Sequence, residues 1–503
     1  MARHCGWKSV IVLGLLCAGT LAFGQASQQI ARVDANGASV TTNVGPLLTT
    51  EPLVAAPRAS GIVWTQFVTD SIAQSVAMSD TTNESWVGEN VNSQRLSYYQ
   101  TVGNGIPQWE FPFTDNPDVV IVASAADVSL GVVGTHTTAS GVKLQSFDRN
   151  HHPTPGLWGY GFEAPFVNIG AKAISIASDG HLVLAAAQAT YPDQRSLVVV
   201  LDGVTGAELT RKIIPQLVGA VELSEDATRA VLTEGATTEI VDIPTLNSLF
   251  SFQVSGGGGT ARISRDGKVV AAGGFNYMVV KDMGGGTWST IYSGSEGNQW
   301  FGAGIGLSGD GSLMFLVSYY YTNYLTLVYR SIDLVHQVEL ARITTTGTGG
   351  FQDTVQRAEV SADGRVYVVA SWGTQDMVHP QTQIFDRMLN RLGGISSPGS
   401  PFDMDLERSG QYLLIGCKHV HANTFGNGGD VFVYAVPILV PGDLNCDGVI
   451  NFGDINPFVL ALSNPAGYNT AFPWCNILNG DTNGDGLVNF GDINPFVAIL
   501  TGS

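Results

Sequence analysis

Two stretches near the C-terminus carry closely spaced oxygen-bearing side chains, the kind of ligand that a hard metal ion needs. Each stretch places Asp or Asn at loop positions 1, 3, 5, 9 and 12, and Gly at position 6. Calcium takes about six to eight oxygen ligands, which short Asp and Asn side chains supply without long flexible stems, and the glycine makes the sharp turn. The pattern therefore predicts two calcium ions. The predicted ligands are Asp443, Asn445, Asp447, Val449, Asn451, Asp454, Asp481, Asn483, Asp485, Leu487, Asn489 and Asp492.

These ligands are not all expected to bind in the same way. Val449 and Leu487, at position 7, should bind through their backbone carbonyls, and the asparagines at position 9 should act through water. An EF-hand loop ends in Glu at position 12, whereas both loops here end in Asp. An apolar segment follows each loop directly, at residues 455–462 and 493–500, and we expect each segment to form a helix.

On these features residues 443–503 resemble a type I dockerin, which has two calcium loops that each run into one helix. The resemblance implies a docking module that binds a cohesin domain, typically in an assembly that degrades polysaccharides. Familiar dockerins often carry Ser-Thr at loop positions 10 and 11, where this chain has Phe452-Gly453 and Phe490-Gly491. The implied partner is therefore a cohesin-like or other protein.

The two halves of this module are nearly identical around the start of each helix, and two interpretations stay open. In the first, the module presents the same binding face twice. In the second, the halves pack on each other through Phe458, Val459, Phe496 and Val497, and calcium serves stability alone. In either case, a module of about 60 residues has too small a core to fold reliably without a metal ion or a disulfide.

The start of the chain is typical of a secretory signal peptide. Arg3 and Lys8 precede an apolar run at residues 10–23, and small residues follow at Gly24 and Ala26. This order of charged, apolar and small residues predicts cleavage after residue 24 or 26. The run is shorter than the roughly 20 apolar residues of a membrane-spanning helix. We therefore expect an exported protein, secreted or held at the cell surface, with no membrane span.

The expected use of the cysteines follows from export, because disulfides persist in oxidising compartments. The exported chain keeps Cys417, Cys446 and Cys475. We expect a disulfide between Cys446 and Cys475, since both lie in the C-terminal module. Cys417 is expected to be free and buried at the end of an apolar strand at residues 412–417.

The body of the chain repeats a turn signature of Ser, Asp and Gly between two apolar strands. The repeats are spaced by about 40 to 53 residues, the range typical of β-propeller blades. The turns lie around residues 178–180, 224–226, 264–267, 308–311, 361–364 and 408–410. In phase with them, apolar strands end in Asp148, Asp202, Asp242, Asp282 and Asp386. Each unit predicts four strands, and the turn aspartates are expected to set strand register rather than to do chemistry.

The composition agrees with an all-β fold. Charged residues are 13% of the chain and glycine occurs 61 times, which fits a turn-rich β protein and excludes a disordered chain or a coiled coil. We predict a seven- or eight-bladed β-propeller followed by a small α-helical, EF-hand-like dockerin module. The propeller resembles the superfamily of WD-repeat-like and quinoprotein-like proteins, although the Trp-Asp and Gly-His signatures are missing. A strand at residues 62–67 is expected to close the ring beside the last strand, at residues 431–436.

The sequence also predicts the domain boundaries, and its net charge limits the possible partners. The predicted segments are a signal peptide at 1–26, an N-terminal segment at 27–60, the propeller at 61–437, a short proline-bounded linker at 438–442 and the dockerin-like module at 443–503. The formal net charge of −19 repels phosphate backbones, so nucleic acid is excluded as a partner.

The propeller sequence contains no Gly-x-Ser-x-Gly elbow, His-Glu-x-x-His helix or phosphate-binding glycine loop, and no catalytic residue is predicted. Aromatic residues at 319–324 and at Trp158 and Tyr160 either pack between strands or form a platform for sugar rings or a partner. His419 and His421, two residues apart, are an alternative metal site for zinc.

The predicted function is that of a secreted propeller for binding or display, attached through its calcium-dependent dockerin-like tail to a cohesin-type or surface partner, in the setting of polysaccharide degradation. The alternative is a glycoside hydrolase or polysaccharide lyase carried on the same anchor, with a polysaccharide as its ligand. The lining of the central channel distinguishes the two, because converging carboxylates, His, Arg and Tyr favour catalysis and an apolar lining counts against it.

Overall fold

The computed structural model divides the chain into two units. The first unit, Met1–Pro46, contains a hairpin of β1 (Gln28–Val33) and β2 (Ser39–Val44). The second unit, Leu47–Ser503, contains the repeats and the C-terminal module. The described residues are 28–33, 39–44 and 61–501, except 69, 92, 116, 139–140, 151–155, 257–258, 427, 438, 446–448, 473–474 and 486. The predicted signal peptide, Cys446 and Asp447 lie outside the described residues.

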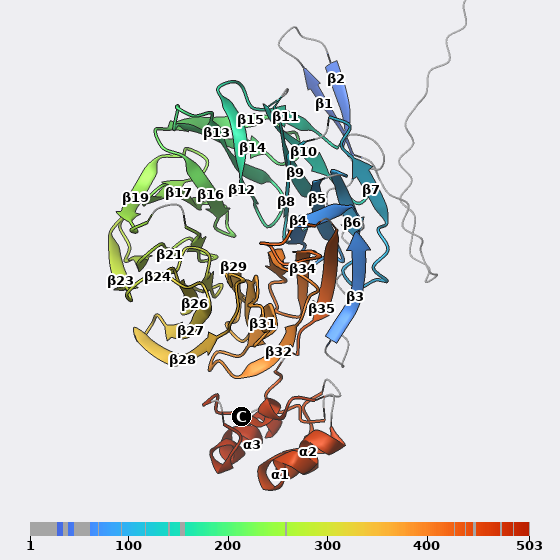
Figure 1. Cartoon of the computed structure of the whole chain (residues 1–503), viewed down its shortest axis with the longest axis vertical. Helices are drawn as coiled ribbons and strands as arrows, with labels where there is room; N and C mark the ends of the chain where they lie inside the picture. Colours follow the sequence, from blue (N-terminus) through green and yellow to red (C-terminus); the bar gives the residue numbers. More distant parts are fainter. Residues whose placement is uncertain are drawn as a thin grey trace, which may run out of the picture. The chain divides into compact units, whose positions relative to one another are not determined.

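The repeats of the second unit form a β-propeller, in which antiparallel sheets stand around a central channel (Figure 1). Among the described residues, seven sheets make up eight blades, because one eight-stranded sheet contains two blades. Strand pairing links these two blades where Lys172 pairs in parallel with Ala220. The sequence left seven or eight blades open, and the structure has eight.

The first four blades hold the following strands, numbered from the channel outwards. Blade 1 contains β4 (Ser71–Met78), β5 (Ser85–Val91), β6 (Arg95–Tyr99) and β7 (Trp109–Pro112); blade 2 contains β8 (Val119–Ser124), β9 (Gly131–Thr137), β10 (Gly141–Phe147) and β11 (Gly159–Gly161); blade 3 contains β12 (Phe166–Ile176), β13 (Leu182–Ala189), β14 (Ser196–Asp202) and β15 (Glu208–Ile214); blade 4 contains β16 (Val218–Leu223), β17 (Arg229–Glu234), β18 (Thr237–Asp242) and β19 (Ser248–Gln253).

The remaining blades follow the same order. Blade 5 contains β20 (Ala261–Ile263), β21 (Val269–Gly273), β22 (Tyr277–Asp282) and β23 (Trp288–Gly294); blade 6 contains β24 (Gln299–Trp300), β25 (Ile305–Leu307), β26 (Leu313–Tyr320), β27 (Thr326–Asp333) and β28 (Val338–Thr346); blade 7 contains β29 (Val355–Val360), β30 (Tyr367–Ser371), β31 (Thr382–Phe385) and β32 (Arg391–Ile395); blade 8 contains β33 (Pro401–Leu406), β34 (Tyr412–Lys418), β35 (Gly429–Ala435) and β3 (Gly61–Val68).

Blade 8 closes the ring with a strand from the other end of the propeller sequence. β3 pairs antiparallel with β35, from Gly61 opposite Ala435 to Val68 opposite Gly429. The predicted closing strand is confirmed. The ring is thereby held by main-chain hydrogen bonds between its first and last strands rather than by a covalent link.

The repeated Ser-x-Asp-Gly turn joins the first and second strands of a blade. In blade 5 the Ser264 hydroxyl donates to Asp266 Oδ1 (2.8 Å) and accepts from the backbone N–H of Val269 (2.9 Å). Asp266 Oδ1 also accepts from the N–H of Lys268 (3.1 Å), and Gly267 has a φ of +66°, which favours glycine. The predicted role of these aspartates in setting the turn is confirmed.

The middle strands of the blades form the core. In β14, the side chains from Val198 to Leu201 are fully buried, because neighbouring blades cover both faces of the sheet. The fourth strands alternate between exposed and partly buried residues, as β15 does. The continuous apolar runs seen in the sequence are therefore the second and third strands.

The described residues of the C-terminal module form three short α-helices and three 3₁₀ turns. They are η1 (Phe452–Asp454), α1 (Ile455–Ser463), α2 (Pro465–Ala471), η2 (Ile477–Gly480), η3 (Phe490–Asp492) and α3 (Ile493–Thr501). Helices were expected at 455–462 and 493–500, and α1 and α3 confirm both, whereas α2 was not predicted. Phe458 and Phe496 stack with ring centroids 4.1 Å apart. Val459 and Val497 are about half exposed, so the expectation that they join this packing is wrong.

The cysteines agree with part of the prediction. Cys475 is disulfide-bonded, and its expected partner, Cys446, lies outside the described residues. Cys417 is free and fully buried in β34. Burial raises the pKa of the Cys417 thiol well above its ordinary value, which disfavours the reactive thiolate.

We therefore expect Cys417 to be inert in the folded protein. A thiol reagent added to the native protein should leave Cys417 unmodified within hours, and denaturant should make this thiol reactive. Rapid labelling of native Cys417 would contradict the burial of this side chain. Substitution of Cys417 by Ser is a control that should abolish the thiol released by denaturant.

Candidate functional site

Side chains on the first strands tie neighbouring blades together across the channel wall. Ser75 Oγ on β4 accepts a hydrogen bond from the backbone N–H of Val122 on β8 (3.1 Å). Between blades 7 and 8, the carboxylate of Glu359 accepts a hydrogen bond from the backbone N–H of Leu406 (2.6 Å). The first strands are sheet edges, and unpaired edge N–H groups are costly once they are shielded from water. These polar side chains satisfy them.

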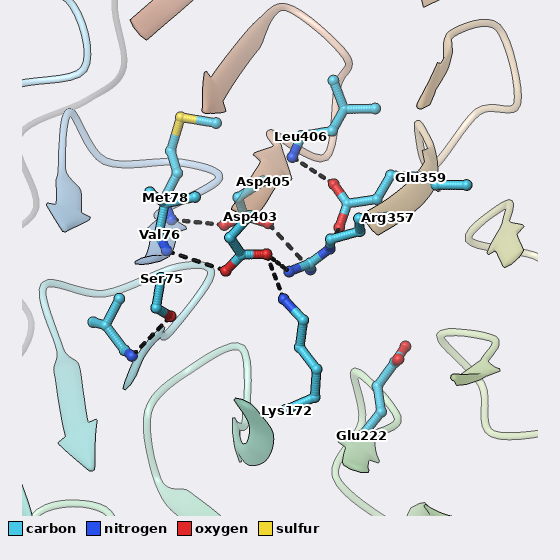
Figure 2. Close-up of polar contacts among 12 residues, drawn as sticks. Ser75, Val76, Met78, Lys172, Glu222, Arg357, Glu359, Asp403, Asp405 and Leu406 are labelled. Carbon is cyan, nitrogen blue, oxygen red and sulfur yellow. Dashed lines mark hydrogen bonds and ion pairs between the residues drawn. The ribbon is translucent and has the colours of Figure 1, made fainter. Parts of the chain in front are cut away.

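Two carboxylates serve the junction at which the ring closes. Asp403 on β33 accepts from the N–H of Val76 on β4 (3.1 Å), and Asp405 accepts from the N–H of Met78 (2.7 Å). Both aspartates lie on the face of β33 that points toward the channel (Figure 2).

The carboxylates of the wall belong to a larger ion network inside the channel (Figure 2). Asp403 Oδ1 binds both Lys172 Nζ and Arg357 Nη1, the latter at 3.0 Å. Arg357 also pairs with Glu359 through Nε, and its Nη2 lies 3.8 Å from Asp405 Oδ1.

Arg262 continues the network toward blades 4 and 7. Its Nη1 lies 3.2 Å from Glu222, and its Nη2 lies 3.3 Å from Glu359. Its Nε donates to the backbone carbonyl of Ile305 (3.1 Å). Charged side chains from blades 3, 4, 5, 7 and 8 thus meet in one place.

Lys172 reaches this network because β12 is irregular. The pairing of β12 with β13 shifts between Ile169 and Ile174, and Lys172 lies within this bulge. A bulge redirects the side chain that it carries. It allows Lys172, which begins in blade 3, to bind Asp403 of blade 8.

The network shifts the proton affinities of its members. Burial opposes the charge on Asp403, but the charges of Lys172 and Arg357 overcome it and hold the pKa of Asp403 below its ordinary value. Burial and the neighbouring Glu359 raise the pKa of Asp405 well above its ordinary range. Burial and then the charge of Arg357 lower the pKa of Lys172.

Two cavities lie along the channel, one of about 250 Å³ and one of about 290 Å³. Both are lined by the same four charged residues, which are Glu222, Arg262, Arg357 and Asp405. Carboxylates and arginines do converge here, as a catalytic site would require. Each of these four pairs with other members of the network or with backbone groups, which is a structural use of the charges.

The second calcium-type loop is held closed by its last aspartate. Asp492 is fully buried, and its Oδ1 accepts from the N–H groups of Thr482 (2.9 Å) and Asn483 (3.0 Å), while Oδ2 accepts from the N–H of Asn489 (2.9 Å). At the start of the loop, Asp481 Oδ1 accepts from the N–H of Gly484 (2.8 Å).

The first loop has the same arrangement around Asp454. This buried carboxylate accepts from the N–H groups of Leu444 (2.8 Å), Asn445 (3.1 Å) and Asn451 (2.9 Å). In their described residues the two loops therefore share the same backbone hydrogen bonds to the last aspartate, which hold it against the first residues of the loop. The side chains of Val449 and Leu487 point to solvent, being 58% and 64% exposed, which is compatible with binding through their carbonyls.

The chemistry of the module fits a divalent cation. Residues 437–503 contain six aspartates, all at predicted ligand positions, and no Lys, Arg or His. Asp443, Asp454 and Asp492 are buried, and buried carboxylates require a compensating positive charge. Within the described residues no group of three or more His, Cys, Asp or Glu side chains is placed to hold a metal ion, and Asp447 lies outside them. The calcium sites stay a prediction.

The two histidines proposed as a zinc site, His419 and His421, have separate contacts within the protein. His419 Nδ1 lies 2.9 Å from Asp430 Oδ2, whereas His421 Nε2 lies 3.0 Å from the carbonyl of Gly373 and its ring stacks on Phe351. The two histidines therefore do not share a metal site. In the part of the chain that the structure describes, no helix is long and apolar enough to cross a membrane.

Comparisons with known proteins identify the fold. No protein-family model matches the sequence, and no curated protein matches it. Among solved structures, the chain is similar to the C-terminal WD40 domain of Sif2, with a TM-score of 0.52, 15% identity, and coverage of 78% of this chain and 100% of that one. It is also similar to the Dos1 propeller (TM-score 0.53, 11% identity, 75% and 95% coverage) and to Sqt1 from Chaetomium thermophilum (0.52, 13%, 75% and 99%).

These similarities contradict the predicted function. The similar structures are WD40 propellers, a class typical of protein-interaction scaffolds rather than of secreted anchors for polysaccharide degradation. The predicted display protein bound to a cohesin in polysaccharide degradation, with its glycan-active alternative on the same anchor, is therefore wrong, whereas the predicted export stays a prediction. At these identities the likeness shows the fold alone, and the repeats of this chain have the β-propeller fold of WD40 domains.

Proposed function

We propose that this protein is an interaction scaffold whose propeller binds a protein partner and whose C-terminal module is folded by two calcium ions. WD40 propellers generally bind proteins, which supports a protein partner in general terms. The charged side chains of the channel pair with one another and with backbone groups at the blade junctions. We therefore place the binding surface outside the channel.

The observation that carries the proposal is a partly exposed aromatic cluster on blades 5 and 6, built from two loops and the strand β24. Phe275 contacts Trp300 and Tyr321 at ring-centroid distances of 5.0 and 5.3 Å, and Tyr321 contacts Tyr324 at 5.3 Å. We call these four residues the aromatic ledge. Tyr321 is 48% exposed although it belongs to this cluster. Aromatic residues are enriched in protein interfaces, and exposed apolar patches mark interaction sites.

The backbone makes room for the ledge. A side chain at Gly302 would place its Cβ 2.5 Å from the Trp300 ring, so only glycine fits there without moving the indole. Phe275 follows β21, and Tyr321 and Tyr324 follow β26, so these residues come from equivalent loops of neighbouring blades. The ledge was marked in the sequence as residues 319–324, but the contributions of Phe275 and Trp300 appear only when the blades are side by side.

Site-specific photo-crosslinking tests the ledge. A photo-reactive residue at Tyr321 is expected to capture one dominant protein from an extract of the source cells. The same residue at Val335, an exposed position in the turn after β27 of the same blade, is the matched control. With the captured protein in hand, Tyr321→Ala should weaken binding at least tenfold, because truncated interface tyrosines commonly cost about 2 kcal/mol or more. Equal capture from both positions, or unchanged affinity, would refute the proposal.

The finer proposal for residues 443–503 is a dockerin-like fold with two calcium ions. It is supported by the shared loop geometry, the buried carboxylates and the lack of basic residues in the module. When bound, the ions would be held by the carboxylate, amide and backbone oxygens of the two loops and would supply the missing positive charge. The proposed location is outside the cytoplasm, on the basis of residues 1–26, and N-terminal sequencing of the mature chain would test cleavage after residue 24 or 26.

Calorimetric titration of the metal-stripped chain with Ca²⁺ tests the sites directly. We expect two ions per chain, and one ion for the Asp492→Asn variant, because the amide loses the charge but keeps an acceptor for the loop. The control is Asp363→Asn, which changes an aspartate of a propeller turn. Failure of the wild-type chain to take up Ca²⁺ would remove this part of the proposal and leave the aromatic ledge untouched.

A further inference from the structure

A belt of backbone hydrogen bonds links the turns that follow the first strands. The N–H of Glu225 donates to the carbonyl of Arg265 (3.0 Å), and that of Arg265 donates to Gly309 (2.8 Å). The belt continues from Gly309 to Ala362 (3.0 Å) and from Ala362 to Arg408 (2.8 Å). One residue per turn thus connects blades 4 to 8 at this end of the channel, which we call the turn end.

Where the ring closes, the acceptor of the belt hydrogen bond is a side-chain carboxylate instead of a backbone carbonyl. The N–H of Arg408 in blade 8 donates to Asp80 Oδ1 of blade 1 (2.7 Å), so a carboxylate stands where the other turns use a carbonyl. The guanidinium of Arg408 pairs with the same carboxylate, with 3.3 Å between Nε and Oδ2. On the far side of this contact, the N–H of Asp80 donates to the carbonyl of Ala126 (2.9 Å) and the backbone belt resumes.

Arg408 also spans the turn end of the channel. Its Nη1 lies 3.6 Å from Asp127 and 3.3 Å from Glu225, and its Nη2 donates to Ser178 Oγ (3.2 Å). With Asp80, these partners come from blades 1 to 4. Asp80, Glu225 and Arg408 line the cavity of about 290 Å³. Arg408 therefore lies across the mouth of this cavity.

We propose that Asp80 and Arg408 form a latch that holds blade 8 to blade 1 over the turn end of the channel, and that this latch loosens as the pH rises from acidic values to neutrality. Burial raises the pKa of Asp80 to about 7, although Arg408 opposes the shift and Glu407 and Asp127 add to it. The closed latch thus binds a proton more tightly than an open one, in which the carboxyl would reach water and regain its ordinary pKa.

The sign of the effect follows from proton linkage. Below the ordinary pKa of a carboxyl both states are protonated and the closed state is favoured most. As the pH rises toward 7 an open latch has already released its proton whereas the closed latch still holds it, so the open state gains; above about pH 7 both states are deprotonated and the ratio stays constant. For one proton, the ratio of open to closed molecules changes by up to about tenfold per pH unit.

Other charged groups face Asp80, and one of them, Asp405, would produce the same pH dependence if it titrated. Arg408 and Glu407 lie on the turn of blade 8, Asp127 on that of blade 2, and Arg265 on that of blade 5. Asp405 on β33 also interacts with Asp80, and its raised pKa would act in the same direction. The test must therefore separate Asp80 from Asp405.

Hydrogen exchange followed by mass spectrometry tests the latch in the full chain. Protection factors, corrected for the intrinsic pH dependence of exchange, are compared between peptides containing Arg408 and peptides containing Gly309, whose belt contacts use backbone carbonyls only. Between pH 5 and 7 we expect protection around Arg408 to fall by up to tenfold per unit and then to level off above pH 7, while protection around Gly309 stays constant. Constant protection at both sites, or an equal fall at both, would overturn the proposal.

Two variants assign the titrating group. Asp80→Asn mimics the protonated carboxyl and should make protection around Arg408 independent of pH, whereas Asp405→Asn should keep the fall. The opposite result would place the switch at Asp405 and overturn the assignment. Should Asp80→Asn fail to fold, the wild-type comparison of Arg408 with Gly309 still decides whether the junction opens.

Discussion

Chelation of calcium is expected to unfold the C-terminal module and to leave the propeller folded. The module has a core of six buried apolar residues, which are Leu444, Phe458, Ala461, Tyr468, Cys475 and Phe496. So small a core cannot hold six carboxylates together without positive charge. At a thousandfold excess of ligand over its dissociation constant, each ion would contribute about 4 kcal/mol of stability. Loss of both ions would exceed what this core supplies.

Scanning calorimetry with and without EGTA is the measurement. We expect two transitions in calcium, of which only the smaller moves to lower temperature or disappears in EGTA. The double variant Asp454→Asn/Asp492→Asn should resemble the chelated protein even in calcium, while Asp363→Asn should not. A small transition that ignores EGTA would show that the disulfide and the apolar core suffice, and the calcium proposal would fail.

Replacement of Asp403 by Leu is expected to be the most damaging single change in the propeller. Asp403 is the shared partner of Lys172 and Arg357 and also accepts from the N–H of Val76. Its loss leaves the largely buried Arg357 and the partly exposed Lys172 without the carboxylate that they share. Breaking a fully buried ion pair costs about 3–5 kcal/mol, and we expect a loss at or below the lower end of that range because water screens Lys172. Asp403→Asn should cost less, because the amide oxygen still accepts from Val76.

Urea unfolding of the propeller transition measures this cost. Asp363→Leu is the matched control, since Asp363 also accepts backbone hydrogen bonds but its side chain is 45% exposed; we expect a loss of about 1 kcal/mol there. Combining Asp403→Leu with Lys172→Met should restore part of the stability by removing one unpaired cation. Equal losses for Asp403→Leu and Asp363→Leu would contradict a buried, charge-coupled network.

The sequence predicted the propeller because its turns repeat, and it left the number of blades open where the turns depart from the repeat. The turn of blade 8 has Glu407 and Ser409 in place of the usual Ser and Asp, and that of blade 1 places Asp80 directly after Ser79 without a glycine. Both irregular turns belong to the closing junction, where Asp80 and Arg408 replace a backbone contact. Local sequence rules fail there because the contact is made between the two ends of the repeat array.

The ion network could not be found by motif, since each member lies on a different blade and the set meets only in the closed ring. A weaker signal was present. Arg357 and Glu359, and likewise Asp403 and Asp405, stand two residues apart in otherwise apolar strands, which puts each pair on one face. Charged pairs at this spacing in the first strand of a blade indicate a polar channel wall.

The functional prediction failed for a different reason. It transferred the setting of a resembling C-terminal module to the whole chain, although most of the chain is the propeller. The helix positions were predictable because apolar runs are a local property. The proposed aromatic ledge was not, because it combines Phe275, Trp300 and Tyr321 from two blades.

The pairing of β3 with β35 also sets the order of events during synthesis. The ribosome makes β3 several hundred residues before its partner, which at about 5–20 residues per second is a delay of tens of seconds. Throughout this time the nascent chain carries an open strand edge that other chains can capture. Chains that terminate early can never cover this edge, so slow decoding or premature stops in the later blades should load the cell's chaperones more than equal defects elsewhere.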